Sequence, residues 1–215
     1  GEEQSQIEEG KQAMNNSVTE RITMHYDLLI DEGNDPFRDP PVLQEYMDRW
    51  DGRALIDAMA LGKEKTVLEI GIGTGRIAKK VAPYCLQLTG IDISPKTIER
   101  ASINLSAYSN IVYLCADYLR YPFTLTYDVI YSSLTMMHFE DKQGVIAKVD
   151  SLLKVGGVFC LSIDKNQSKY IDMGDRRIEV YPDTVDDIVS SLSKTNMKLS
   201  AVREIENAFL ITCNK

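Results

Sequence analysis

Apolar residues recur along the chain with two different periods, and the two patterns alternate. Short apolar runs typical of strands occupy residues 66–70, 86–92, 111–117, 127–133 and 156–164. Between them, apolar positions recur at helical spacing after Thr74, after Pro95 and over residues 141–153. Strands that are apolar on both faces and alternate with helices are typical of a parallel sheet covered on both sides. The pattern predicts an α/β domain.

The C-terminal part of the chain departs from this alternation. A helix is expected over residues 184–194, and two strand-like runs follow at 198–206 and 208–215, separated by Asn207 alone. A parallel crossover needs a dozen or more residues, so this short connection permits only an antiparallel hairpin.

The N-terminal part precedes the first strand and divides into two regions. Residues 1–16 are polar and acidic without an apolar period, which predicts a flexible tail. Residues 17–64 show helical periods, interrupted by the Gly-, Pro- and Asp-rich stretch at 31–41. We expect this second region to form a helical lid over the domain at 65–215.

Composition narrows the class of protein. With 215 residues, 44% of them hydrophobic and 26% charged, the chain fits one globular domain. A net charge of −8 without a Lys/Arg cluster argues against nucleic acid as a partner. No run resembles a leader or a membrane span, so a cytoplasmic protein is expected. The four cysteines lack a Cys-x-x-Cys pair and are expected to be reduced core residues rather than metal ligands.

The stretch VLEIGIGTGR, residues 67–76, carries the strongest chemical signal. Gly71, Gly73 and Gly75 follow a strand that contains Glu69, and a helix is expected to begin near Gly75. Such a turn exposes backbone N–H groups at the carboxyl edge of a sheet. Asp92 ends the next strand, where its carboxylate can accept hydrogen bonds from both hydroxyls of a ribose. Asp117 follows the third strand and can accept a hydrogen bond from an exocyclic amine such as that of adenine. These strand ends predict a ligand that contains a nucleoside.

A nicotinamide dinucleotide is the competing ligand, because a glycine turn with an acid about twenty residues later also describes its binding fold. That fingerprint is G-x-G-x-x-G, and position 76, where its third glycine would stand, is Arg. The spacing therefore disfavours an NAD-binding oxidoreductase.

From about residue 65 to the end, the sequence resembles the class I S-adenosylmethionine-dependent methyltransferases. The resemblance rests on VLEIGIGTGR, GIDIS, CADY, YDVIYSSLTMMHF and LLKVGGVFCLSID as successive motifs. It implies a Rossmann-like, seven-stranded, mostly parallel sheet with an antiparallel C-terminal strand, and S-adenosylmethionine as the cofactor. The cofactor-binding residues that it implies are Glu69, Gly71, Gly73, Gly75, Asp92, Ile93, Asp117, Tyr118, Tyr131 and Ser132.

The resemblance also suggests what each group does. The glycines would lie beside the methionine part of the cofactor, Asp92 on the ribose, Ile93 against the adenine and Asp117 on its amine. Tyr131 and Ser132 would lie near the cofactor's amino group, and Glu69 would organise the turn and water.

The motifs that the chain lacks narrow the range of methyl acceptors. The fourth strand ends in YSSL rather than in the Asn/Asp-Pro-Pro-aromatic stretch of enzymes that methylate base amines. A Pro-Cys nucleophile and an acid-acid-asparagine metal set are also missing. A small molecule is the leading acceptor, with protein or RNA behind it, and a non-catalytic cofactor-binding domain stays open. The attacked atom and the oligomeric state, monomer or homodimer, do not follow from the sequence.

Several residues have both a functional and a structural interpretation. His138 follows the fourth strand and is a candidate general base, or it starts a helix and packs. Tyr26 belongs to the N-terminal helical region and either contacts the cofactor's carboxylate or faces the core. Asp164, Arg176, Arg177 and Tyr181 lie in or beside the insertion after the fifth strand, which either faces the acceptor or is a solvated loop.

Overall fold

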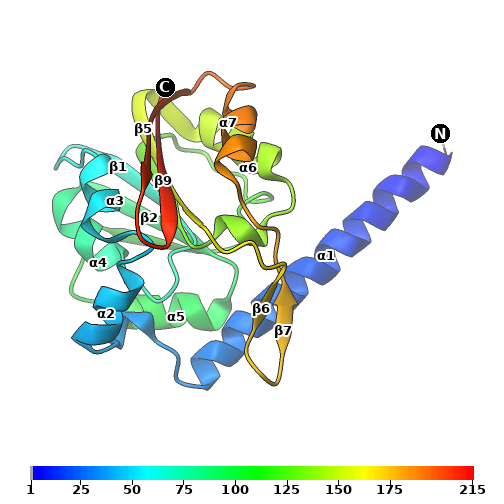
Figure 1. Ribbon diagram of the computed structural model, residues 1–215, viewed down its shortest axis with the longest axis horizontal. Helices are drawn as coiled ribbons and strands as arrows, with labels where there is room; N and C mark the ends of the chain where they lie inside the picture. Colours follow the sequence, from blue (N-terminus) through cyan, green and yellow to red (C-terminus); the bar gives the residue numbers. More distant parts are fainter. Residues whose placement is uncertain (1) are drawn as a thin grey trace.

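The computed structural model describes residues 2–215, and the side chains of residues 4–13 and 17–215. A seven-stranded sheet forms its centre, in the order β3-β2-β1-β4-β5-β9-β8 (Figure 1). Neighbouring strands from β3 to β5 run parallel, and β9 pairs antiparallel with both β5 and β8. The predicted fold class, including the antiparallel C-terminal hairpin, is confirmed. The strands are β1 Thr66–Ile70, β2 Gln87–Asp92, β3 Ile111–Cys115, β4 Tyr127–Ser133, β5 Leu153–Asp164, β8 Lys198–Glu204 and β9 Ala208–Asn214.

Both faces of the central strands are buried, which is why their sequences are apolar throughout. Alternate residues of β1 enter different cores: Leu68 joins a cluster with α6 (Lys142–Leu152) and α7 (Val185–Leu192), while Val67 joins one with α3 (Gly52–Ala58) and α4 (Ala78–Val81). Burying a Val or Leu side chain contributes about 1.5–3 kcal/mol. The two apolar cores therefore hold the sheet and its covering helices together.

Two segments near the sheet edge differ from the sequence prediction. The helix expected near Gly75 begins only at Ala78 and is four residues long, because the three preceding glycines adopt left-handed φ angles. The insertion after β5 forms a small hairpin of β6 (Tyr170–Asp172) and β7 (Arg177–Glu179), where the alternatives were an acceptor-facing or a solvated loop. Its strands are too short for a periodic pattern to reveal.

The N-terminal part begins with one long helix, α1 (Glu2–Asp31). Residues 2–16, where the sequence predicts a flexible tail, continue this helix and extend away from the domain (Figure 1). The C-terminal part of α1 contacts α5 (Pro95–Asn104) and β7. A short 3-10 turn (Pro36–Arg38), α2 (Pro41–Met47) and α3 then lead into β1.

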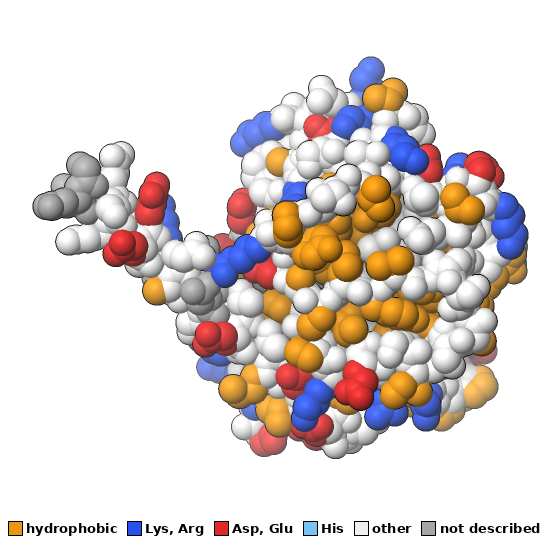
Figure 2. All heavy atoms as spheres, turned by 180° about the vertical axis from the view of Figure 1, so that it is seen from behind, with side chains coloured by type: hydrophobic (Ala, Val, Ile, Leu, Met, Phe, Trp, Pro, Cys, Tyr) orange, Lys and Arg blue, Asp and Glu red, His pale blue; other side chains and the backbone are white. Residues whose placement is uncertain are grey.

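The projecting part of α1 and the domain also differ in the side chains on their surfaces. Figure 2 shows the projecting part of α1 with polar and charged side chains, and hydrophobic side chains gathered over the middle of the domain. Over residues 2–215, no helix combines the length and the apolar character that crossing a bilayer requires.

The cysteines are unpaired, and three of them are buried as predicted. Cys115 is the exception: it is exposed at the end of the edge strand β3, so its assignment to the core is wrong. An edge strand has a neighbour on one side alone, which leaves this position uncovered.

Candidate functional site

A cavity of about 1000 Å³ opens at the carboxyl ends of β1, β2, β3 and β4. The strand ends and the loops after them form its floor, and α1 contributes Ile22 and Tyr26 from above. Parallel strands that diverge at this edge leave a crevice outside their carboxyl ends, which is where ligands bind in open α/β sheets. The loop residues that line the cavity are 69–74, 91–93, 116–120, 133–135 and 138–141.

The three glycines share positive φ angles of +82°, +57° and +101°, but their surroundings differ. A Cβ at Gly71 would overlap the Thr135 side chain, and one at Gly75 would lie 2.7 Å from Leu105. A Cβ at Gly73 would meet nothing within 4 Å. Gly71 and Gly73 line the cavity, whereas Gly75 serves the packing of the turn.

Asp92 closes the turn from the neighbouring strand. Its carboxylate accepts hydrogen bonds from the Gly73 N–H at 3.0 Å and the Ser94 N–H at 3.2 Å. Burial raises the pKa of Asp92, and these backbone donors oppose that rise. The carboxylate lines the cavity, where the predicted contact with a ribose requires it.

Glu69 lies at the bottom of the cavity and is 2% exposed. Burial raises its pKa to about 8, although the Tyr131 hydroxyl donates a hydrogen bond to its carboxyl group at 2.5 Å. At neutral pH this carboxyl group is therefore largely protonated.

The side chains of Tyr131 and Ser132 do not line the cavity, contrary to the prediction. Both are buried inside the covered sheet, and the Ser132 hydroxyl donates to the Ile70 carbonyl at 2.9 Å. Ser133, the last residue of β4, and Leu134 and Thr135, just after it, line the cavity instead.

Ile93, which follows β2, and Asp117 and Tyr118, which follow β3, also line the cavity. Asp117 accepts a hydrogen bond from the Leu119 N–H at 2.9 Å. Tyr118 is 4% exposed, and its hydroxyl donates to the Val145 carbonyl at 3.3 Å, so its ring rather than its hydroxyl faces the cavity.

Arg76 has a role that the sequence did not reveal. Its guanidinium, which also lines the cavity, pairs with both carboxylate oxygens of Asp51, and Asp51 accepts a further hydrogen bond from the Ser133 hydroxyl at 2.7 Å. Both partners are at least nine-tenths buried. This ion pair joins the segment between α2 and α3 to the ends of β1 and β4. In the sequence, the signals for this ion pair were Arg76, directly after the third glycine, and Asp51, an acid to which no role was assigned.

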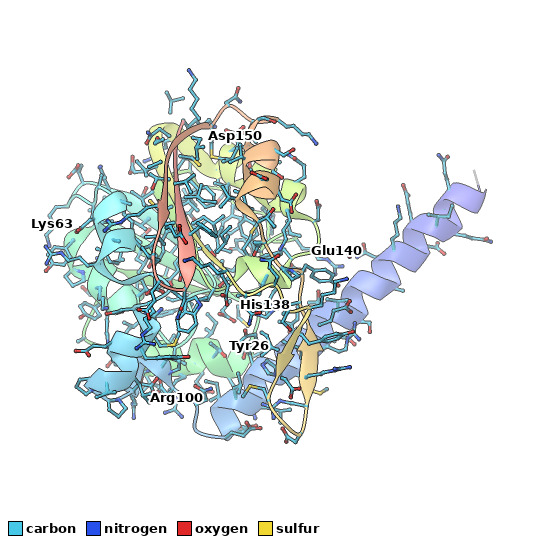
Figure 3. All side chains as sticks on the ribbon, viewed as in Figure 1. Tyr26, Lys63, Arg100, His138, Glu140 and Asp150 are labelled. Carbon is cyan, nitrogen blue, oxygen red and sulfur yellow. The ribbon has the colours of Figure 1, made fainter. Side chains whose placement is uncertain are left out.

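Tyr26 and His138 also line the cavity, where they contact each other. The Tyr26 oxygen lies 2.6 Å from Nε2 of His138, and Figure 3 shows the two side chains next to one another where α1 meets the domain. Burial, together with His25 and Lys142, lowers the pKa of His138 to about 4. Nδ1 of His138 is buried without a hydrogen-bond partner. At neutral pH the imidazole is uncharged and can accept a proton.

The insertion contributes to this side of the cavity. Tyr181 lines it, and the Tyr181 N–H donates to the Met137 carbonyl at 2.7 Å. Arg176 contacts α1 through His25 and Glu32, whereas Arg177 lies over the exposed ring of Tyr170. Asp164 lines a separate shallow recess. Of these four residues, Tyr181 reaches the cavity directly.

The site fits S-adenosylmethionine in its shape and donor set. Gly73 offers an open backbone surface, Asp92 a carboxylate at the end of β2, and Asp117 an acceptor at the end of β3. These are the groups that a main chain, a ribose and an adenine need.

Residues 68–161 match the family model described as "Methyltransferase domain". Nodulation protein S of Sinorhizobium fredii is 28% identical over 114 residues, 51% of this chain and 53% of that protein. Ubiquinone biosynthesis O-methyltransferase of Nitrosomonas europaea is 31% identical over 117 residues, 50% of this chain and 48% of that protein. The chain thus spans about half the length of the curated relatives that it matches.

Among solved structures, the N-methyltransferase NodS from Bradyrhizobium japonicum WM9, in complex with S-adenosyl-L-homocysteine, superimposes with a TM-score of 0.63. The two chains are 20% identical, and the alignment covers 82% of this chain and 88% of that one. This likeness is one of fold. Together with the family model matched over residues 68–161 and the motif order along the sheet, it shows that this part of the chain is similar to methyltransferase domains and has their fold.

Proposed function

We propose that the protein transfers a methyl group from S-adenosylmethionine to a small-molecule acceptor. One observation carries this proposal: a single cavity is lined both by the glycine turn with Asp92 and by the Tyr26–His138 pair. A cofactor held by the strand ends would leave the part of the cavity beneath α1 for an acceptor.

The residues that would hold the cofactor are those of the strand ends. Gly71 and Gly73 would lie along its methionine part, Asp92 would accept from the ribose hydroxyls, and Ile93 and Tyr118 would pack beside the adenine. Asp117 would accept from the adenine amine. Ser133 to Thr135 take the place of Tyr131 and Ser132 in this scheme.

The cofactor supplies a methyl group on a positively charged sulfur, which is already an activated leaving group. The protein's main tasks are therefore to hold the acceptor in line and to exclude water. The helix α1 performs the second task, since its residues Ile22 and Tyr26 cover the cavity.

His138 would take the proton that an oxygen or nitrogen acceptor loses when its bond to carbon forms. Its imidazole is neutral at pH 7, and its Nε2 is already hydrogen-bonded to Tyr26. The acceptor's proton would pass to the Tyr26 oxygen while the Tyr26 hydroxyl proton moves to Nε2, and Tyr26 would also hold the ring in place. The relatives' names include both an N- and an O-methyltransferase, so they do not decide the attacked atom.

The cavity of about 1000 Å³ and the net charge of −8 favour a small molecule over RNA or protein. Calorimetric titration with S-adenosylmethionine, S-adenosylhomocysteine and NAD tests the cofactor. Release of S-adenosylhomocysteine with a panel of phenols, carboxylic acids, amines and thiols tests the reaction. Binding without release for any acceptor would favour a non-catalytic domain, and binding of NAD alone would contradict the proposal.

A further inference from the structure

Both histidines of the chain flank Tyr26. The His138 ring contacts the phenol ring with their centroids 5.4 Å apart, and the His25 ring contacts it at 5.0 Å. Both contacts are edge-to-face, which is a favourable aromatic geometry. His25 is 3% exposed and does not line the cavity. Its position is therefore one from which it supports Tyr26 without touching a ligand.

Arg176 holds His25 from outside. Its Nε–H donates to Nδ1 of His25 at 3.3 Å, and its two terminal nitrogens form a fork with the Glu32 carboxylate. Glu32 follows the last residue of α1, whereas Arg176 lies in the turn between β6 and β7. One guanidinium thus ties the β6–β7 hairpin to the end of α1 at two points, and it uses three of its donors.

This contact selects one form of the His25 ring. Since Nδ1 accepts a hydrogen bond, the proton of the neutral ring must be on Nε2. A proton on Nδ1 would break the hydrogen bond and place two cations together. The charged groups that act on the ring are Arg176, which opposes its protonation, and Glu32, which favours it; His25 in turn acts on His138.

We infer that Arg176 is a positioning residue for the methyl-transfer site. It fixes the ring of His25 and the end of α1, and His25 in turn holds Tyr26 so that its hydroxyl meets Nε2 of His138. The catalytic consequence rests on the proposed function. The structural consequence can be measured in the protein alone.

The test uses the fact that the chain has two histidines, so that the imidazole region of a ¹⁵N NMR spectrum contains two rings. The variants are Arg176→Ala and Arg176→Lys, with Arg177→Ala as the matched control because Arg177 stacks on Tyr170 instead. His138→Gln assigns the signals. Circular dichroism and thermal melting verify that each variant is folded.

In the parent, His25 is expected to show an unprotonated Nδ1 and a protonated Nε2. In Arg176→Ala, the His25 signals should move toward a mixture of tautomers and the His138 signals should shift with them. Arg176→Lys, with a single cationic nitrogen in place of the fork, should restore the spectrum in part. Arg177→Ala should match the parent.

With an acceptor found in the panel, Arg176→Ala should lower kcat about tenfold or more, because small misplacements of reacting groups are costly. Its affinity for S-adenosylhomocysteine should stay within about twofold of the parent, because Arg176 does not line the cavity. Unchanged imidazole signals in folded Arg176→Ala, or equal changes in Arg177→Ala, would overturn the inference. Absence of turnover in the parent would instead count against the proposed function and leave the NMR result standing.

Discussion

The Gly73 N–H donates a hydrogen bond to the Asp92 carboxylate at 3.0 Å, so the glycine turn and the end of β2 form one unit. The turn follows β1, which pairs in parallel with β2, and both residues line the cavity. This bond preorganises the turn, because it holds a left-handed glycine at the point where the backbone is most open.

Replacement of Asp92 by Ala is expected to weaken cofactor binding by about tenfold to a hundredfold. A lost hydrogen bond to a charged group costs about 1.5–3 kcal/mol, and the bond that shapes the turn is lost as well. Calorimetric titration with S-adenosylhomocysteine measures the effect, and Asp92→Asn, which keeps an acceptor oxygen, should lose less. Binding by folded Asp92→Ala as tight as in the parent would show that this strand end does not hold the ribose.

The glycines should separate into two functional classes. Gly73→Val is expected to abolish cofactor binding while most of the fold persists, because its side chain would enter open cavity space. Gly75→Ala is expected mainly to destabilise the protein, because its Cβ would collide with Leu105. Both carry the cost of a positive φ. Thermal melting and calorimetric titration of the two variants distinguish ligand approach from packing, and identical behaviour would refute the distinction.

The Asp51–Arg76 ion pair should be needed for stability. Asp51→Ala leaves the buried Arg76 without its main partner and frees the Ser133 hydroxyl, which should cost about 3–5 kcal/mol. Arg53→Ala, which breaks an exposed pair with Asp57 nearby, should cost less than about 1 kcal/mol. Urea unfolding of both variants measures the difference. Similar small losses for both would mean that Arg76 finds enough compensation in Asp48.

Stability should depend on pH through His138. Its pKa is about 4 in the folded protein, against the ordinary histidine value of 6.5 in the unfolded chain, so the unfolded chain binds more protons between these values. The contribution of His138 is fully present above pH 6.5 and is lost as the pH falls toward 4, by up to about 3 kcal/mol. Glu69 has the opposite effect on stability: its pKa is raised to about 8, so its contribution is present below pH 4.5 and is lost as the pH rises from 4.5 to 8.

Because these two windows overlap, the measurement is the difference between the parent and His138→Gln in urea unfolding from about pH 4 to 8. The difference should change most between pH 4 and 6.5. A difference that is constant with pH would show that His138 titrates alike in the folded and unfolded chains.

The N-terminal helical section should respond to the cofactor. We expect residues from about 17 to 51 to gain protection from hydrogen exchange when S-adenosylhomocysteine binds, together with residues 71–75, because α1 covers the cavity that contains the glycine turn. Gly73→Val with the same ligand is the control and should show neither change. Protection confined to the glycine turn and strand ends would make the N-terminal section a fixed brace rather than a lid.

The sequence by itself determined the sheet and the residues at its carboxyl edge. β1 and β4 have the predicted bounds, and Gly73, Asp92, Ile93 and Asp117 lie at the predicted cavity, because apolar strands and the residues at their carboxyl ends are local features. The hairpin of β8 and β9 followed from the short connection at Asn207 between the two expected strands, since so few residues cannot form a crossover.

The tertiary structure alone decided which side chains meet across long sequence distances. Tyr26 and His138 are 112 residues apart, and no local pattern encodes their contact. It also removed the Tyr131 and Ser132 side chains from the cavity wall, because coverage of both sheet faces depends on helices elsewhere in the chain. The ion pair of Arg76 with Asp51 and the hold of Arg176 on His25 arise for the same reason: folding brings separate elements together, and burial then selects the partners of each polar group.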